Sequence, residues 1–342
     1  MPSTEDVANE ASVGPAPDAD DQSFPYARSL TAADDGLHPP GPQPLWQESS
    51  LVAFVDPARG LAGFHRIGMH PNGGQASIYS WTQVDGKIVS RAKRTGLPLP
   101  IGPVTGTTLE GVSFETPDPL RTCRIRVDRD GVQTDVLFES FTGPVQMNMD
   151  GAGATVGRGH YDSLGKVTGH ITAGGQIHPF DGVGFLDHSW GARDGRSILA
   201  HRWFMAVLDE HNHLNTFPGV GLKGRGMIGY MVLDGVYSKV ADVQSELHVG
   251  DDYLGLNGAY ARVTDRLGRT VEIRGRAAGE YNVQPYGQGY FCAHVPMIFE
   301  SGAQNWRGMV EWAPMRFIPP WIREGLGLAP DNEWLQWQGS PP

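Results

Sequence analysis

Polar and apolar side chains alternate along much of the chain with a period of two. Residues 124–127, Arg-Ile-Arg-Val, are a short example of this pattern, which is typical of half-buried β-strands. Strands are expected at 50–56, 61–69, 75–84, 87–94, 124–127, 132–139, 201–208, 227–233, 236–249, 260–265, 270–276, 290–299 and 306–312. Asp-Gly pairs at 85–86, 130–131 and 234–235 favour two-residue hairpin turns. The pattern predicts an all-β protein built from antiparallel meanders.

Glycine and proline punctuation supports the same fold class and suggests its division. The chain has 342 residues with 46 Gly and 26 Pro, which argues against long helices and suits two domains. A Gly-Ala-Gly-Ala run at 151–154 marks a boundary. We therefore predict a disordered, acidic and Pro-rich lead at 1–40, β-domains at 41–152 and 153–318, and a tail at 319–342. Closing each β-domain into a barrel would remove exposed edges.

Charge and the lack of recognisable targeting segments bear on the partners and the location of the protein. The formal net charge is −11, with many of the acids in the first 35 residues and no basic stripe, so nucleic acid is not an expected partner. No run of about 18 apolar residues predicts a membrane span. The N-terminus does not resemble a secretory signal, so we expect a cytoplasmic protein. Homo-oligomer formation stays open.

Residues 182–194 place several chemically reactive side chains close together between glycines. Asp187, His188, Ser189 and Trp190 are consecutive, and Arg193 follows closely. In a strand, Asp187 and Ser189 would share one face while His188 and Trp190 share the other. A histidine beside an indole lies in apolar surroundings, which lower its pKa unless a carboxylate offsets the burial. Imidazole is the usual proton-transfer group near neutral pH. A purely structural role, with a turn cap, a surface ion pair and a core tryptophan, is the alternative.

Further histidines flank this segment. His160-Tyr161-Asp162 precedes it, and His201-Arg202-Trp203 follows it. If 182–191 and 201–208 formed a hairpin, His188 would meet His201 or Trp203 across it.

Metal and nucleotide motifs are not recognisable. The one His-x-His pair, His211 and His213, falls in an expected turn, and no zinc-protease motif or facial triad occurs, so we predict no metal. The two cysteines, Cys123 and Cys292, are far apart and lack a Cys-x-x-Cys spacing. Residues 219–224 match Gly-x-Gly-x-x-Gly without the strand–helix context of a dinucleotide site, so no cofactor is expected.

The run Gly-Phe-Leu-Asp-His-Ser-Trp-Gly-Ala-Arg-Asp at 184–194 resembles the carotenoid 1,2-hydratase and AttH-like superfamily, and most closely its bacterial branch with a DHSWGxRD motif. The segment 160–165 and the strand containing Trp203 are also similar to that branch. The resemblance covers about residues 45–315. It implies two tandem lipocalin-like antiparallel β-barrels with the motif in the second.

The resemblance also implies the chemistry. Its members add or remove water at alkenes or promote cyclisation, so a cofactor-independent lyase acting by acid/base catalysis on a hydrophobic terpenoid-, steroid- or aromatic-type molecule is expected. A non-catalytic ligand carrier and a pericyclic cyclase or isomerase are the alternatives. The candidate catalytic residues are His188, Asp187, Tyr161 and His201, with His188 in the direct role. The candidate substrate-binding residues are Trp190, Trp203, His160, Arg193 and Tyr290.

Overall fold

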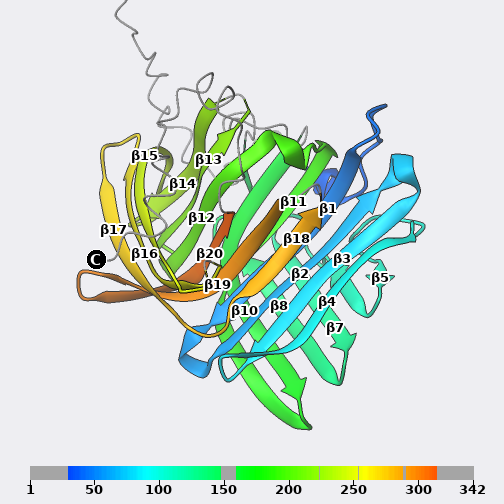
Figure 1. Ribbon diagram of the computed structural model, residues 1–342, viewed down its shortest axis with the longest axis horizontal. Helices are drawn as coiled ribbons and strands as arrows, with labels where there is room; N and C mark the ends of the chain where they lie inside the picture. Colours follow the sequence, from blue (N-terminus) through cyan, green and yellow to red (C-terminus); the bar gives the residue numbers. More distant parts are fainter. Residues whose placement is uncertain (1–29, 148–158, 223, 253, 288–289, 314–342) are drawn as a thin grey trace, which may run out of the picture.

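The computed structural model describes residues 30–147, 159–222, 224–252, 254–287 and 290–313. Two curved antiparallel sheets form nearly all of it (Figure 1). The first sheet contains β1 (Trp46–Asp56), β2 (Leu61–His70), β3 (Gln75–Val84), β4 (Lys87–Pro98), β5 (Thr108–Leu109), β6 (Val112–Glu115), β7 (Thr122–Arg129), β8 (Val132–Ser140), β9 (Val145–Gln146), β10 (Gly159–Ala173) and β11 (Gln176–Ala192). The all-β prediction is confirmed.

The second sheet closes into a barrel. It contains β12 (Ile198–Asp209), β13 (Asn212–Gly221), β14 (Gly224–Leu233), β15 (Val236–Val249), β16 (Leu256–Asp265), β17 (Thr270–Ala277), β18 (Asn282–Gly287), β19 (Tyr290–Ser301) and β20 (Gln304–Ala313). Its order is β17-β16-β15-β14-β13-β12-β20-β19-β18, and pairing of β17 with β19 completes an eight-stranded barrel. The first sheet is curled without such a closing pair among the described residues, in the order β4-β3-β2-β1-β11-β10-β8-β7-β6-β5.

The predicted Asp-Gly hairpins are present. Asp85, Asp130 and Asp234 have φ between 51° and 54°, and the glycine after each has φ between 75° and 77°. Two successive left-handed residues form the type I′ turn whose twist matches that of paired strands. The helical elements described are short 3-10 turns, η2 (Ala32–Asp35), η3 (Pro57–Arg59), η4 (Pro71–Gly73) and η6 (Gly195–Ser197). Within the described ranges, no helix combines the length and apolar content needed to cross a membrane.

The strand that carries the Asp-His-Ser-Trp motif belongs to the first sheet. β11 lies between β1 and β10, with Ser50 opposite His188 and Tyr161 opposite His188 on the other side. Sequence reasoning placed this motif in a second domain at 153–318, whereas β11 pairs with β1 across the first sheet. The division into domains at 152/153 stays a prediction.

The hairpin between 182–191 and 201–208 is not formed. β11 pairs with β1 and β10, whereas β12 pairs with β13 and β20. The turn η6 lies between β11 and β12 and takes the chain from one sheet to the other. His188 and His201 therefore lie in different sheets.

Apolar side chains fill three layers. One core lies inside the curled first sheet, around residues such as Phe54 and Phe138, and another lies inside the barrel, around residues such as Phe204 and Phe299. A third core joins the two sheets and includes Phe185 of β11 and Trp203 of β12. Because strand residues alternate, each central strand contributes one face to its own sheet's core and the other to this inter-sheet layer.

The end of the predicted lead is packed on the first sheet. We call residues 30–40 the arm. Leu30 is 8% and Asp35 is 5% exposed, and the Asp35 carboxylate accepts hydrogen bonds from the Leu120 backbone N–H (2.5 Å) and from the Tyr161 hydroxyl. The expectation of disorder is wrong for the arm, because Asp35 caps buried polar groups of the sheet. Residues 1–29 of the lead and the tail 319–342 lie outside the described residues.

Candidate functional site

Side chains of β11 alternate between the two faces of the first sheet, as predicted. Asp187 contacts His160 in the layer between the two sheets, and His188 contacts Ser50 and Glu48 on the opposite, concave face. The motif therefore contributes to two separate clusters.

The first cluster lies between the sheets and joins two acids to one histidine. We call His160, Asp162 and Asp187 the acid cluster. His160 Nε2 lies 2.6 Å from Asp162 Oδ1 and 3.3 Å from Asp187 Oδ2. Asp162 Oδ2 accepts a hydrogen bond from the Asn215 amide (2.8 Å), and the Asn215 oxygen accepts one from Trp203 Nε1 (2.5 Å). This chain of contacts links β10 and β11 of the first sheet to β12 and β13 of the barrel.

Burial and the closeness of the two carboxyls shift the pKa values in the acid cluster. Burial raises the pKa of Asp162 to about 6, and the nearby charge of Asp187 adds to this, although His160 opposes it. Burial lowers the pKa of His160, but the charges of Asp162 and Asp187 outweigh it and raise that pKa overall. A carboxyl group that titrates near neutral pH is able to donate a proton to a bound molecule.

A second inter-sheet cluster has the opposite composition. We call His201, His294 and Glu311 the barrel cluster. Glu311 Oε1 lies 2.9 Å from His201 Nε2, and Glu311 Oε2 lies 2.8 Å from His294 Nε2. Cys292 Sγ lies 3.9 Å from His201 Nε2. Burial would raise the pKa of Glu311, but hydrogen bonds from both imidazoles outweigh it and hold that pKa well below its usual range. Glu311 is therefore a buried, ionised carboxylate.

Aromatic rings lie between the two inter-sheet clusters. The Trp203 ring has its centroid 6.4 Å from that of His160 and 5.3 Å from that of Phe217. Phe217 in turn stacks on His201 at 4.6 Å. Phe185 meets Trp203 edge-on at 4.7 Å. The π faces of such rings favour positive charge, and these rings lie between the acid cluster and the barrel cluster.

An apolar pocket opens in the same layer. Its volume is about 20 Å³, which is room for about one water molecule. Residues of β1, β10, β11, β12 and β20 line it, among them Phe185, Met205 and Met309. Phe185 contacts Trp203, and Met309 precedes Glu311 by two residues on β20. Small-molecule sites typically measure roughly 300–1,000 Å³, so binding of a ligand here would require the side chains around the pocket to move.

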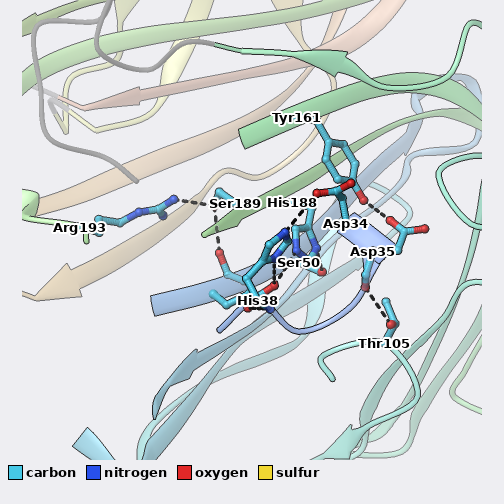
Figure 2. A network of polar contacts seen from close by, with 11 residues as sticks. Asp34, Asp35, His38, Ser50, Thr105, Tyr161, His188, Ser189 and Arg193 are labelled. Atoms are coloured by element: carbon cyan, nitrogen blue, oxygen red, sulfur yellow. Dashed lines mark hydrogen bonds and ion pairs between the residues drawn. The ribbon is translucent and has the colours of Figure 1, made fainter. Parts of the chain in front are cut away.

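The concave face of the first sheet carries a third cluster, which Figure 2 shows from close by. We call His38, Glu48 and His188 the arm cluster. Glu48 Oε1 lies 2.8 Å from His38 Nδ1 and 3.0 Å from His188 Nε2. Trp190 stacks on His38 with ring centroids 3.8 Å apart. A Cβ at Gly159 would lie 2.2 Å from the Trp190 ring, so a glycine is required there for the indole to fit.

Tyr161 also lies on the concave face. Its ring stacks on His188 at 5.4 Å, and its hydroxyl donates to Asp35 of the arm. Burial, followed by the charge of Asp35, raises the pKa of Tyr161 well above its ordinary value. Tyr161 is thus a neutral donor to the arm.

The structure divides the predicted site residues among these places. Asp187, His160 and Trp203 meet around the acid cluster, and His201 lies in the barrel cluster. His188, Tyr161 and Trp190 lie on the concave face. Arg193 donates to Ser189 Oγ at 2.6 Å (Figure 2). Tyr290 begins β19, but its side chain lies outside the described residues.

The two histidines of the His-x-His pair are separated by burial. His211 is exposed in the turn before β13, whereas His213 is fully buried within β13, where desolvation lowers its pKa to about 4. The two imidazoles therefore lie in different environments, one in solvent and one buried in the interior of the protein.

Sequence reasoning missed several members of the clusters, including Glu48, Asn215, His294 and Glu311. Their signal was a polar residue on a strand of otherwise apolar character. Glu311 stands between Val310 and Trp312, and His294 stands between Ala293 and Val295. Burial of such groups is costly unless they are paired, so polar residues in apolar strands point to partners elsewhere in the chain.

Solved structures with the same fold are similar over most of the chain. A putative AttH from Nitrosomonas europaea has a TM-score of 0.61 and 14% identity, covering 82% of this chain and 94% of its own. Kievitone hydratase from Nectria haematococca has a TM-score of 0.55 and 11% identity, covering 83% and 92%. CghA has a TM-score of 0.54 and 13% identity, covering 79% and 88%. At these identities the likeness establishes the tandem lipocalin-like fold. No curated protein sequence matches the chain.

A family match covers both sheets and all three clusters. Residues 31–316 match the family described as Domain of unknown function (DUF7064), from the arm through the last strand of the barrel. The chain is a member of the DUF7064 family.

Proposed function

We propose that this protein is a hydratase-type lyase that adds water to, or removes it from, a carbon–carbon double bond of a hydrophobic small molecule held between the two sheets. The observation that carries the proposal is that two clusters whose carboxyl pKa values are shifted in opposite directions lie on either side of a set of aromatic rings. A carboxyl with a pKa of about 6 lies on one side, and an ionised carboxylate held by two imidazoles lies on the other. The fold shared with kievitone hydratase supports the same chemistry.

In the hydration direction, the Asp162 carboxyl transfers its proton to one alkene carbon, and the π electrons form the new C–H bond. Positive charge develops on the other carbon, next to the faces of Trp203 and Phe217. Water attacks that carbon, and its proton passes to the Glu311 carboxylate. Exchange through solvent returns a proton to Asp162, so no net proton is consumed. Dehydration follows the same steps in reverse.

Within the acid cluster, Asp187 and Asn215 have positioning roles. Asp187 Oδ2 lies 3.3 Å from His160 Nε2 and helps Asp162 to raise the pKa of His160, and Asn215 fixes the second oxygen of Asp162. Sequence reasoning favoured His188 for direct proton transfer, which stays a prediction. The proposal assigns that role to Asp162 because His188 lies on the concave face.

The test is a product screen with isotopically labelled water. Purified protein is incubated in H₂¹⁸O with hydrophobic terpenoid, steroid and prenylated aromatic alkenes and with the corresponding tertiary alcohols, and products are read by mass spectrometry. We expect ¹⁸O incorporation or loss of water with at least one class. Asp162→Asn should reduce the rate by about 10²-fold or more. Asp135→Asn, which removes a partly exposed partner of Arg124 on the same sheet, is the matched control and should keep the rate.

A non-catalytic carrier of hydrophobic ligands is the second candidate, favoured by the apolar walls of the pocket. Saturable binding of a screened compound without turnover, and with equal affinity in Asp162→Asn, would establish the carrier and exclude the hydratase.

A further inference from the structure

Three groups of side chains in the described part of the chain could ligate a metal. The groups are His38, Glu48 and His188, then His160, Asp162 and Asp187, and finally His201, Cys292 and Glu311. In each, one ligand atom per residue lies within 4.8 Å of the others. The second and third belong to the proposed reaction site, whereas the first is on the opposite face of the first sheet.

The imidazoles of the arm cluster are both held at their outer nitrogen. His188 Nδ1 lies 2.7 Å from Ser50 Oγ, and His38 Nε2 lies 3.3 Å from Asp34 Oδ1. Figure 2 shows both contacts. Metal-binding histidines nearly always have the second ring nitrogen fixed by an oxygen, which sets the tautomer and aims the other nitrogen at the ion. By contrast, His160 Nδ1 and His294 Nδ1 of the inter-sheet clusters are buried without a partner in the described residues.

The donor atoms of the arm cluster converge from three segments. His38 comes from the arm, Glu48 from β1 and His188 from β11. The carboxylate oxygen lies 2.8 Å and 3.0 Å from the two ring nitrogens. Ligand atoms around a tetrahedral zinc with bonds of about 2.0–2.1 Å lie roughly 3.3 Å apart, so a small adjustment would admit the ion.

The exposure of the three side chains and the types of their donor atoms also suit a metal ion. The His38 side chain is 17% exposed, whereas Glu48 and His188 are each 1% exposed. A cation can therefore reach the ligands from the arm side and be held by buried donors. Two nitrogens and one oxygen form a donor set that suits Zn²⁺, with one position left for water.

We propose that His38, Glu48 and His188 bind one divalent transition-metal ion, with Zn²⁺ the best fit, and that this ion fastens the arm to the first sheet. The sequence pattern predicted no metal, because ligands 10 and 140 residues apart form no recognisable motif. The proposal does not depend on the proposed lyase activity.

The experiment titrates ZnCl₂ into the EDTA-treated full-length protein by calorimetry and follows the melting temperature. We expect one tight equivalent and a rise in melting temperature. His38→Gln should weaken Zn²⁺ binding by about 100-fold or more, and Ser50→Ala, which removes only the outer contact of His188, by about 10- to 100-fold. His211→Gln, which alters an exposed histidine, is the matched control and should bind normally.

CoCl₂ distinguishes the arm cluster from the barrel cluster. Co²⁺ at the arm cluster should give no thiolate charge-transfer band, because its donors are nitrogen and oxygen. A band that Cys292→Ser abolishes would place the ion at the group formed by His201, Cys292 and Glu311 and overturn the proposal. The absence of tight Zn²⁺ binding, or unchanged affinity in a folded His38→Gln variant, would overturn it equally. Circular dichroism of each metal-free variant checks folding.

Discussion

The acid cluster and the barrel cluster face the same inter-sheet layer but differ in their ratio of acids to imidazoles. His160 is the one imidazole in contact with two carboxyls of the acid cluster, and the pKa of Asp162 is raised to about 6. Glu311 instead receives hydrogen bonds from two imidazoles, and its pKa falls. Both carboxyls are buried, so desolvation acts on them in the same direction and the number of imidazoles decides the sign. Two similar sets of residue types can thus shift carboxyl pKa values in opposite directions a few side chains apart.

The largest expected effect is the stability cost of removing Glu311. The folded-state pKa of Glu311 is depressed, so its stabilising contribution is present above the unfolded pKa near 4.5 and is lost as pH falls toward the folded value. Glu311→Gln should therefore lower the unfolding free energy at pH 7 by about 3 kcal/mol or more, and by progressively less in acid. Urea unfolding between pH 4 and 7 measures this.

Asp162 should show the opposite pH dependence. Its folded-state pKa is raised, so its contribution is complete below the unfolded pKa near 3.8 and is lost as pH rises through about 6. A shift of about two pKa units corresponds to ~3 kcal/mol. The stability advantage of wild type over Asp162→Asn should fall by about that amount between pH 4 and 7. Parallel curves for the Asp162→Asn and Glu311→Gln variants would mean that the two carboxyl pKa values are not shifted in opposite directions.

The next effect tests which face of β11 carries the chemistry. Asp187→Asn removes one of the charges that raise the pKa of His160, and we expect turnover of a screened substrate to fall by about 10²-fold. His188→Gln should cost less than about 10-fold, because His188 faces the arm. Rates are compared in folded variants at pH 6. A larger loss for His188→Gln would return the direct role to the residue that the sequence favoured.

The smallest expected effect lies outside both inter-sheet clusters. A chain beginning at residue 41 lacks Asp35, which accepts from Tyr161 and Leu120, whereas one beginning at residue 30 keeps it. Leaving buried donors unpaired costs about 1–3 kcal/mol. The shorter chain should be less stable by that amount in urea, with the pH dependences assigned to Asp162 and Glu311 unchanged. Equal stability of the two chains would show that the arm is dispensable, as its composition suggested.

Much of the fold followed from the sequence because strand alternation and turn chemistry are local. The Asp-Gly pairs at 85–86, 130–131 and 234–235 required left-handed backbone, and each formed a hairpin turn. The runs expected at 75–84 and 236–249 coincide with β3 and β15. Alternation also determined that Asp187 and His188 point to opposite faces, whichever sheet received them.

The tertiary structure alone decided the partners of those residues. β11 forms a local hairpin with β10, but on its other side it pairs with β1, more than 100 residues away, rather than with β12. The β1–β11 pairing brought Glu48 to His188, contact between the sheets brought Asn215 to Asp162, and pairing within the barrel brought Glu311 to two histidines. A single strand specifies which residues it will bury, but the protonation state of a buried group depends on what the other strands place opposite it. The sequence therefore determined the strands and the faces of their side chains, and the packing of the two sheets determined the chemistry of the site.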